Sequence, residues 1–274
     1  MLIETLSTFP HMYDSVMGES MMKRAQEKGI LEFRAHDLRD WTHDRHRTTD
    51  DDPYGGGAGL VMKCDPIFEA VEAILGKEFV EAKLAAAPPQ GESQQRSSAA
   101  PQIVFLAPQG RPFDDAYADK LAAADHLLFI CGHYEGIDER VYTLADHVIS
   151  LGDYVLTSGE LASMVVIDAA VRKLPGVLGA AEGPVDESFT SGLLEYPQYT
   201  RPADFRGMAV PEVLTSGNHA AIARWRREQS LARTAAARPD LIAAAEAAGR
   251  LTPADQKFLK LLEPASTGAV EGVS

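Results

Sequence analysis

Two short apolar runs in the middle of the chain each end in a loop that carries glycine and an acidic side chain. The first run, residues 127–131, precedes Gly132 and Glu135, and the second, residues 147–150, precedes Gly152. Short apolar runs bounded by glycine are typical of buried strands in a parallel sheet. Ligands of open α/β sheets bind just beyond the carboxyl ends of the strands. The spacing therefore predicts a ligand site built from these loops.

A third apolar run, residues 103–106, ends in a similar way at Pro108-Gln109-Gly110. Three such strand ends are a stronger signal than any one loop, because the carboxyl ends of parallel strands lie along one edge of the sheet. None of the loops matches G-x-G-x-x-G, which argues against a nicotinamide dinucleotide as the ligand. The three loops together predict one ligand site of another kind.

A long polar stretch, residues 39–59, ends in a run of glycines. A structured loop of this length is more often functional than decorative. Its glycines lack the following Lys-Ser/Thr of a phosphate-binding loop. His43 and His46 are interleaved with arginines that would repel a cation, so the residues themselves predict no metal site.

The elements around these loops predict an α/β fold. Strands are expected at residues 2–6, 30–35, 103–106, 127–131 and 147–150, and helices at residues 12–28, 65–75 and 113–124. This alternation predicts a mainly parallel sheet with helices on both faces. Residues 83–101, rich in Ala, Pro, Gln and Ser, are predicted to be a disordered surface loop.

The character of the sequence changes near the end of the α/β pattern. Residues 1–178 are predicted to form the α/β domain, residues 179–186 a linker, and residues 187–274 a small all-α domain. Asn218 is a favourable N-cap for a long helix, and Thr252 begins a capping arrangement for the last one. The chain therefore predicts two domains of different class.

The net charge of the 274-residue chain is −14, which argues at first against a nucleic-acid partner. The charge is uneven, because residues 201–238 contain seven arginines, no lysine and three acids. This segment is compatible with a local RNA contact, although charge alone favours a solvated helix face. No apolar run has the length of a membrane span and the N-terminus does not resemble a signal peptide, so a cytoplasmic protein is expected.

Eight motifs follow one another along nearly the whole chain: Thr42-His43-Asp44-Arg45-His46-Arg47-Thr48, Pro53-Tyr54-Gly55-Gly56-Gly57, Pro108-Gln109-Gly110, Tyr134-Glu135-Gly136-Ile137-Asp138-Glu139-Arg140, Gly152-Asp153-Tyr154-Val155-Leu156, Pro175-Gly176-Val177-Leu178-Gly179, Tyr199-Thr200-Arg201-Pro202 and Ser216-Gly217-Asn218-His219. In this order they resemble the bacterial tRNA (guanine-37-N1)-methyltransferases, the TrmD family of the SPOUT methyltransferase class. A chance match at this density is implausible.

The resemblance implies a SPOUT-type α/β fold whose mainly parallel sheet is threaded as a deep trefoil knot, followed by the helical domain. It implies S-adenosylmethionine as methyl donor, held by Pro108, Gly132, Glu135 and the loop Leu151-Gly152-Asp153-Tyr154-Val155-Leu156. It also implies an obligate homodimer with active sites assembled from both subunits. Magnesium is a further expectation of the family, associated with Glu135, although no ligand cluster in the sequence indicates it independently.

The reaction that the resemblance implies is methylation of N1 of guanosine 37 in tRNA. Guanine N1 is protonated in its neutral form, so a carboxylate must remove the proton while a cation stabilises charge spreading toward O6. The family usually reads Asp-Ser-Phe where this chain reads Glu187-Ser188-Phe189, so Glu187 is predicted as the base, with Asp186 as the alternative. Arg172 matches the supporting arginine; by itself it would be a helix C-terminal arginine favoured by the dipole.

Further residues are assigned to tRNA by the same resemblance. Phosphate contacts are predicted for the arginines of the helical domain, and Asp50 in the long loop matches a position important to the family's site; the arginines are Arg201, Arg224, Arg226, Arg227 and Arg233. The target base lies in an anticodon loop that is already single-stranded, so extruding it should cost little. Trp225 could stack on a base, but its small neighbours favour packing within the domain.

Two other functions are weighed against this one. A SPOUT methyltransferase acting on ribosomal RNA is disfavoured, because the motifs at residues 199–219 belong to the tRNA family. A non-catalytic RNA-binding protein of the same fold is disfavoured, because Arg172 and the acidic pair Asp186-Glu187 are retained.

Overall fold

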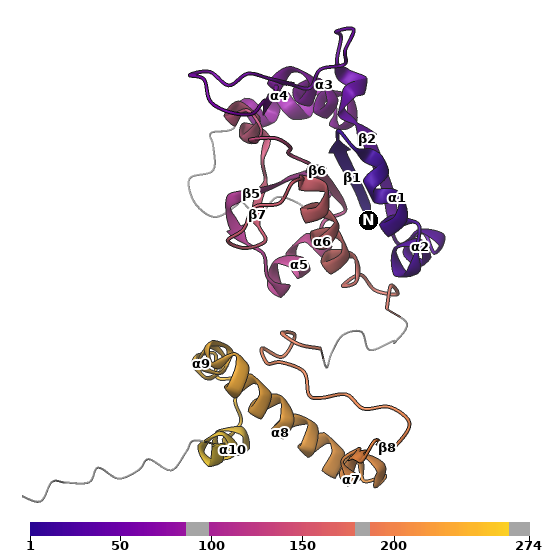
Figure 1. The fold of residues 1–274 in the computed structure, drawn as a ribbon, viewed down its shortest axis with the longest axis vertical. Helices are drawn as coiled ribbons and strands as arrows, with labels where there is room; N and C mark the ends of the chain where they lie inside the picture. Colours follow the sequence, from indigo (N-terminus) through magenta and orange to yellow (C-terminus); the bar gives the residue numbers. More distant parts are fainter. Residues whose placement is uncertain (86–98, 179–186, 263–274) are drawn as a thin grey trace, which may run out of the picture. The chain divides into compact units, whose positions relative to one another are not determined.

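The computed structural model describes residues 1–85, 99–178 and 187–262. The chain divides into two compact units, Met1–Gly183 and Pro184–Ser274, and each is described by itself (Figure 1). The predicted linker, residues 179–186, lies outside the described residues. None of the helices in the described ranges has the length and apolar composition that a membrane span requires.

The first unit is built on a parallel sheet of five strands in the order β2-β1-β6-β5-β7 (Figure 1). The strands are β1 (Leu2–Ser7), β2 (Glu32–Asp37), β5 (Gln102–Pro112), β6 (His126–Ile130) and β7 (His147–Ser150). The predicted parallel α/β sheet is confirmed, while the trefoil knot stays a prediction. Because β6, β5 and β7 are neighbours, their carboxyl ends lie side by side.

Helices cover both faces of this sheet, as the alternating pattern predicted. One face packs against η1 (Pro10–Tyr13), α1 (Asp14–Met17), α2 (Ser20–Glu27), α5 (Asp115–Ala122) and α6 (Gly159–Val171). The other face packs against η2 (Leu38–Trp41), α3 (Cys64–Leu75), α4 (Lys77–Ala85) and η3 (Glu139–Leu144).

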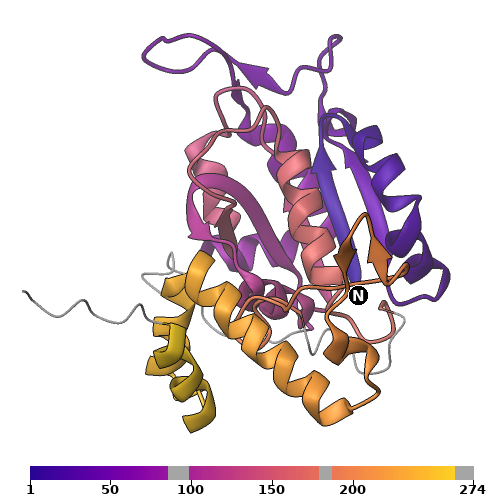
Figure 2. The same cartoon turned by 60° about the horizontal axis from the view of Figure 1, so that its bottom comes forward.

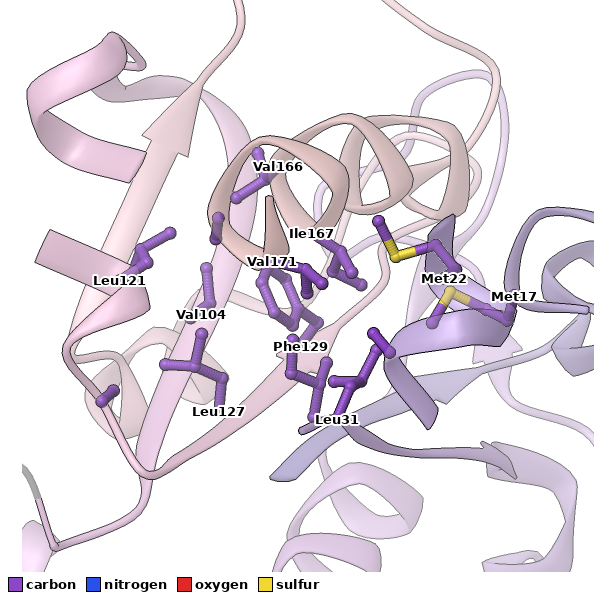
Figure 3. Packing of buried hydrophobic residues seen from close by; sticks show 14 of the residues in the cluster. Met17, Met22, Leu31, Val104, Leu121, Leu127, Phe129, Val166, Ile167 and Val171 are labelled. Carbon is purple, nitrogen blue, oxygen red and sulfur yellow. The ribbon is translucent and has the colours of Figure 1, made fainter. Parts of the chain in front are cut away.

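Helix α6 is the central helix of the first face. Its side chains Val166, Ile167 and Val171 are buried against Phe129 of β6 and Val104 of β5 (Figure 3). Burying a side chain of this size contributes about 1.5–3 kcal/mol. This packing fixes the N-terminus of α6 against the sheet edge where the glycine loops emerge.

The single helix predicted at residues 12–28 is wrong, because the segment forms η1, α1 and α2 in succession. The break falls at Gly18, where an added Cβ would lie 2.6 Å from the carbonyl oxygen of Asp14, and at Ser20, whose φ is +48°. The apolar periodicity continues across the break because Met17 and Met22 face the same core. A periodic pattern alone therefore could not reveal the interruption.

The disordered loop predicted at residues 83–101 is wrong at its start, where Lys83 belongs to α4. The ammonium group of Lys83 donates to the carbonyl oxygen of Leu144 at 2.7 Å and pairs with Asp146 Oδ2 at 2.5 Å. The side chain of Lys83 is only 4% exposed. The same Asp146 oxygen accepts from the backbone N–H of Ile103 at 2.8 Å. The pair therefore ties α4 to the connection before β7 and to β5; residues 86–98 lie outside the described residues.

We expect Lys83→Ala to lower the free energy of unfolding by about 3 kcal/mol, because it removes the buried cation that pairs with Asp146. The loss should lie near the low end of the range for such pairs, since Asp146 keeps the N–H of Ile103. Urea unfolding measures the change. The control is Glu81→Ala on the exposed side of α4, expected within about 0.5 kcal/mol of the parent. Equal losses in the two variants would contradict the role given to the pair.

His147, at the start of β7, is buried between two hydrogen-bond partners. Its Nε2 lies 2.7 Å from Oε1 of Gln102, and its Nδ1 lies 2.9 Å from the hydroxyl of Tyr117. Because the amide oxygen can only accept, Nε2 carries the proton and Nδ1 accepts from Tyr117. Burial, together with a smaller effect of the charge of Lys120, lowers the pKa of His147 to about 4.

The low pKa of His147 predicts a loss of stability in acid. Between the unfolded pKa, about 6.5, and about 4, the unfolded chain binds a proton that the folded one excludes. The contribution of neutral His147 to the free energy of unfolding is complete above the pKa of the unfolded chain. It declines as the pH falls, by roughly 3 kcal/mol in total. Urea unfolding from pH 7 to pH 4 should show a decline in the parent that exceeds that of His147→Gln by about this amount. Parallel declines would contradict the assignment.

The second unit is mainly helical, as predicted, with one short hairpin (Figures 1 and 2). Its elements are β8 (Asp204–Phe205), β9 (Met208–Ala209), α7 (Glu212–Thr215), α8 (His219–Ala237), α9 (Pro239–Ala247) and α10 (Pro253–Leu262). Asn218 caps α8 by accepting from the N–H of Ala221 at 3.1 Å. Thr252 and Asp255 exchange hydrogen bonds of 2.9 and 3.2 Å at the start of α10. Both predicted caps are confirmed.

Candidate functional site

The carboxyl ends of β5, β6 and β7 enclose a cavity of about 320 Å³. The three glycine-bearing loops and the start of α6 line it, so the predicted convergence of the loops is confirmed. Of the residues expected to hold a cofactor, those that line the cavity are Pro108, Gly132, Glu135, Leu151, Gly152, Tyr154, Val155 and Leu156. Asp153 lies on the same loop but is not among the lining residues.

The β5 wall of the cavity is an irregularity in the strand. The pairing of β5 with β7 shifts register between Leu106 and Arg111, and the intervening residues Pro108 and Gln109 line the cavity. The strand can make this detour because Gly110 lies against the backbone of β7. A Cβ at Gly110 would lie 2.5 Å from the backbone nitrogen of Ile149, closer than a side chain can approach. Glycine is therefore required here by close approach of two strands.

The opposite wall is formed where α6 begins against the end of β6. The N–H of Gly159 donates to the carbonyl oxygen of Gly132 at 2.8 Å, and a Cβ at Gly159 would lie 2.7 Å from the Gly132 nitrogen. The preceding residue, Ser158, is 8% exposed and lines the cavity. Its hydroxyl is buried and has no hydrogen-bond partner among the residues that the structure describes. Buried hydroxyls nearly always have a partner, and the position of Ser158 on the cavity wall places its hydroxyl where a bound molecule could provide one.

A buried carboxylate beneath the cavity joins α6 to the β6 loop. Glu160 is fully buried, accepts from the hydroxyl of Ser7 and lies 2.6 Å from Nε2 of His133. The backbone N–H of His133 in turn meets the sulfur of Met62 at 3.2 Å. Sequence reasoning did not single out Glu160 or His133. The sequence does show Glu160 directly after Gly159, at the end of a glycine-bearing loop. Its partner Ser7 is 153 residues away in the chain, so the pairing could not be predicted.

The long polar loop is attached to the same site. Within it, β3 (Asp50–Asp51) pairs with β4 (Val61–Met62), and the N–H of Met62 donates to the carbonyl oxygen of Gly136 at 3.0 Å. Tyr134, which lines the cavity, faces Asp50; burial raises the pKa of Tyr134, and the charge of Asp50 raises it further. Asp50, expected to serve tRNA, is therefore placed beside the loop that lines the cavity.

The other predicted catalytic residues are each placed within their own unit. Arg172 is the C-cap residue of α6 in the first unit and is half-buried. Glu187 is the first described residue of the second unit, directly before a turn in which Phe189 donates its N–H to the carbonyl oxygen of Leu193 at 2.8 Å. Asp186, the alternative base, lies outside the described residues.

The five arginines predicted to contact tRNA differ in what they already bind. Arg201 and Arg224 are exposed. Arg227 donates twice to Asp255, at 3.1 and 2.9 Å, and Arg233 donates to the carbonyl oxygen of Glu195 at 3.2 Å. The guanidinium of Arg226 lies over the ring of Tyr196, 4.7 Å from its centroid. Contacts within the unit thus distinguish Arg226, Arg227 and Arg233 from the other two arginines, which charge alone could not do.

In the described ranges, no group of three or more His, Cys, Asp or Glu side chains could hold a metal ion. Glu135, the acid associated with magnesium by resemblance, therefore belongs to no such group among the described residues.

The arrangement resembles a cofactor site of a methyltransferase, and comparison with known proteins decides the family. A family model described as tRNA (Guanine-1)-methyltransferase TrmD matches residues 1–244. The chain belongs to this family. Relatives named tRNA (guanine-N(1)-)-methyltransferase share 51% identity in Limosilactobacillus reuteri, covering 90% of this chain and 91% of the relative, and 51% in Symbiobacterium thermophilum, covering 95% and 97%. As a TrmD-family protein, this chain is a tRNA guanine-N1 methyltransferase, a class that takes its methyl group from S-adenosylmethionine.

Proposed function

We propose that the protein methylates N1 of guanosine 37, next to the anticodon of tRNA, and that the cavity at the ends of β5, β6 and β7 holds S-adenosylmethionine. The observation that carries the proposal is that three glycine loops line one cavity in a chain of the TrmD family. The cofactor would supply a methyl group on a sulfonium, ready for transfer. The chain has to bind it, expose the methyl group and remove a proton from the base.

The residues present fit this cofactor. Gly132 and the 151–156 loop offer backbone donors and acceptors at the cavity wall, while the absence of side chains at Gly110 and Gly159 lets β5 approach β7 and the start of α6 approach the end of β6. The unpaired hydroxyl of Ser158 is one group that needs a partner from outside the described chain. We infer that it binds a polar atom of the cofactor.

We expect Ser158→Ala to weaken S-adenosylmethionine binding about tenfold, because the lost hydrogen bond is worth about 1–1.5 kcal/mol. The stability of the cofactor-free protein should stay unchanged or rise, because the substitution removes a buried hydroxyl without a partner. Calorimetric titration and urea unfolding measure the two quantities. Lower stability with unchanged cofactor affinity would show that the hydroxyl serves the fold instead.

We assign proton removal to Glu187 and charge stabilisation to Arg172. The carboxylate of Glu187 takes the proton from guanine N1, which frees the electron pair on N1 to accept the methyl group. S-adenosylmethionine would supply that group, and its sulfur would keep the electron pair of the bond to the methyl carbon and leave as a neutral thioether. Negative charge that spreads onto O6 during proton removal is stabilised by the guanidinium of Arg172. Magnesium is given no step, since the described residues do not form a site for it.

We also propose that the protein acts as a homodimer with composite active sites. Tyr154, Val155 and Leu156 on the cofactor loop are 58%, 86% and 41% exposed. Leu161 and Val165, one turn apart on α6, are 44% and 54% exposed. Exposed apolar side chains next to a binding site mark a surface that a partner covers, and a second copy of this chain is the expected partner.

Since tRNA is a cytoplasmic substrate, we place the enzyme in the cytoplasm.

For the tRNA contact, we retain Arg201 and Arg224 as the leading phosphate contacts, because both are exposed and, unlike the exposed Arg233, neither donates to another group among the described residues. Arg226, Arg227 and Arg233 keep this role only in addition to their contacts within the unit. Asp50, beside Tyr134, is proposed to position the bound tRNA near the cavity.

One assay tests the proposed function. The protein is incubated with S-adenosylmethionine labelled in the methyl group and with tRNA transcripts that carry G or A at position 37. We expect label in the G37 transcript alone, at N1 of the guanine. Label in both transcripts, in neither, or in ribosomal RNA instead would contradict the proposal.

A further inference from the structure

The second unit contains its own cavity, also of about 320 Å³. It is lined only by residues of this unit, between positions 196 and 226. Three aromatic rings and two arginines are among them: Tyr196, Tyr199, Trp225, Arg201 and Arg226. None of the described residues that line this cavity is an acid. A cavity of this composition suits a flat, electron-rich ligand that carries negative charge nearby.

Two of the segments that line the cavity carry its aromatic rings. Helix α8 presents Ile222, Trp225 and Arg226, which share one helix face because Trp225 and Arg226 lie three and four residues after Ile222. The extended segment before the hairpin presents Tyr196 and Tyr199. The rings of Tyr199 and Trp225 lie 6.3 Å apart at 54°, so they form an angled pair. Trp225 therefore packs within its unit, as its neighbours indicated, and also lines a cavity.

Two side chains at the cavity keep groups that could contact a ligand: the exposed ring of Tyr199 and the Nε donor of Arg226. Tyr199 is 49% exposed, although it belongs to an aromatic cluster. Nε of Arg226 is buried and finds no acceptor in the part of the chain that the structure describes. A buried charged donor without an acceptor is costly, so a ligand acceptor is the expected partner. Ring and donor together point to a ligand that both stacks and accepts a hydrogen bond.

We propose that this cavity binds an unstacked nucleobase of the tRNA substrate, other than the guanine that is methylated. This inference rests on the proposed function. Single-stranded bases stack on tyrosine, tryptophan and arginine planes and offer ring nitrogens and carbonyls as acceptors. The seven arginines and three acids of residues 201–238 give this segment a positive balance that attracts a polyanion such as RNA. The cavity would then add a fixed point of contact between the tRNA and the second unit.

The first test replaces Tyr199 in the full-length protein. Tyr199→Leu removes the ring, and Tyr199→Phe keeps it. We expect the dissociation constant for a G37 tRNA transcript to rise about tenfold in Tyr199→Leu and to change less than about twofold in Tyr199→Phe, the size of one lost base stack. The methylation KM should rise with it, while kcat at saturating tRNA stays unchanged, because the ring does not contact the reacting atoms.

Two further variants separate stacking from other effects. Phe205→Leu alters an equally exposed ring on the β8–β9 hairpin, outside the cavity, and should bind like the parent. Arg226→Lys keeps the positive charge but removes the Nε donor, so it should weaken tRNA binding. This variant reports the hydrogen bond, and Tyr199→Leu reports the stacking ring. Thermal unfolding of each variant identifies a loss that reflects folding. If Tyr199→Leu binds tRNA like the parent while folded, the inference is overturned.

The second test identifies the base. Abasic sites are placed one at a time at the unpaired positions of the transcript, with G37 kept. One abasic site should weaken binding of the parent about as much as Tyr199→Leu does, and should cause no further loss in that variant. Additive losses at every position would overturn the inference. Methylation of G37 by the parent, measured in the same series, reports the proposed function independently.

Discussion

Glu187→Gln should lower the turnover of G37 methylation by about 10²–10⁴-fold, the usual effect of losing a general base. Glutamine has nearly the same shape but cannot take a proton at neutral pH, so guanine N1 would keep its proton and have no electron pair to attack the methyl carbon. Binding of tRNA and of S-adenosylmethionine should stay close to that of the parent. Single-turnover rates with saturating tRNA and cofactor measure the chemical step directly.

The matched control for this prediction is Asp186→Asn. Both changes remove one carboxylate from the same stretch, and only the base itself should affect the rate strongly. A second control, Glu187→Asp, restores the residue usual in the family but shortens the side chain by one methylene. If the backbone is set for the longer side chain, this variant should be slower than the parent and faster than Glu187→Gln. A severe loss in Asp186→Asn, with Glu187→Gln active, would transfer the role of base to Asp186.

Local signals were sufficient for much of the fold. Strands buried on both faces are continuous apolar runs, so β6 and β7 were found within a residue of their bounds. Helix caps depend on residues three positions apart, so Asn218 and the Thr252–Asp255 pair could be identified directly. The interruption at Gly18 was missed because both short helices bury their apolar side chains in one core.

What the sequence could not reveal depends on contacts between distant residues. Lys83 looked like part of a disordered stretch, but its partner Asp146 is 63 residues away. Glu160 makes its contacts with Ser7, at the end of β1, and with His133, in the loop after β6. Arg227 has the same charge as Arg224, yet only the fold shows that Asp255 engages it. Pattern and composition cannot report such pairings, because they have no fixed spacing.

The candidate site also has features that the sequence predicted and features that depend on contacts between distant residues. Glycine loops at strand ends predicted the cavity, because the topology of a parallel sheet brings such loops together. Gly110 must be glycine because the backbone of Ile149 lies against it, and Gly159 because the backbone of Gly132 lies against it. Both contacts are made only in the folded chain, so the sequence could not reveal them. Tyr199 was part of a family motif, and its place in a second cavity follows from the fold of α8 beside it.

Arg172→Met should lower kcat for G37 methylation by about 10²–10³-fold, the usual effect of removing one group that stabilises developing charge. The competing explanation is structural, because Arg172 occupies the C-cap of α6, where a cation is favoured by the helix dipole. In that case Arg172→Met would cost about 0.3–1 kcal/mol of stability and leave the rate unchanged.

Arg172→Lys separates these explanations. Lysine keeps the charge at the helix end, so the dipole explanation predicts a variant equal to the parent in both stability and rate. The guanidinium presents a planar fork of donors, whereas the ammonium is a point charge on a flexible stem, so a role at O6 predicts a slower variant of unchanged stability. The loss should appear in kcat, because charge on O6 develops only as the N1 proton leaves. Full activity in Arg172→Lys together with Arg172→Met would assign the residue to the helix alone, and the cation at O6 would then have to come from another residue.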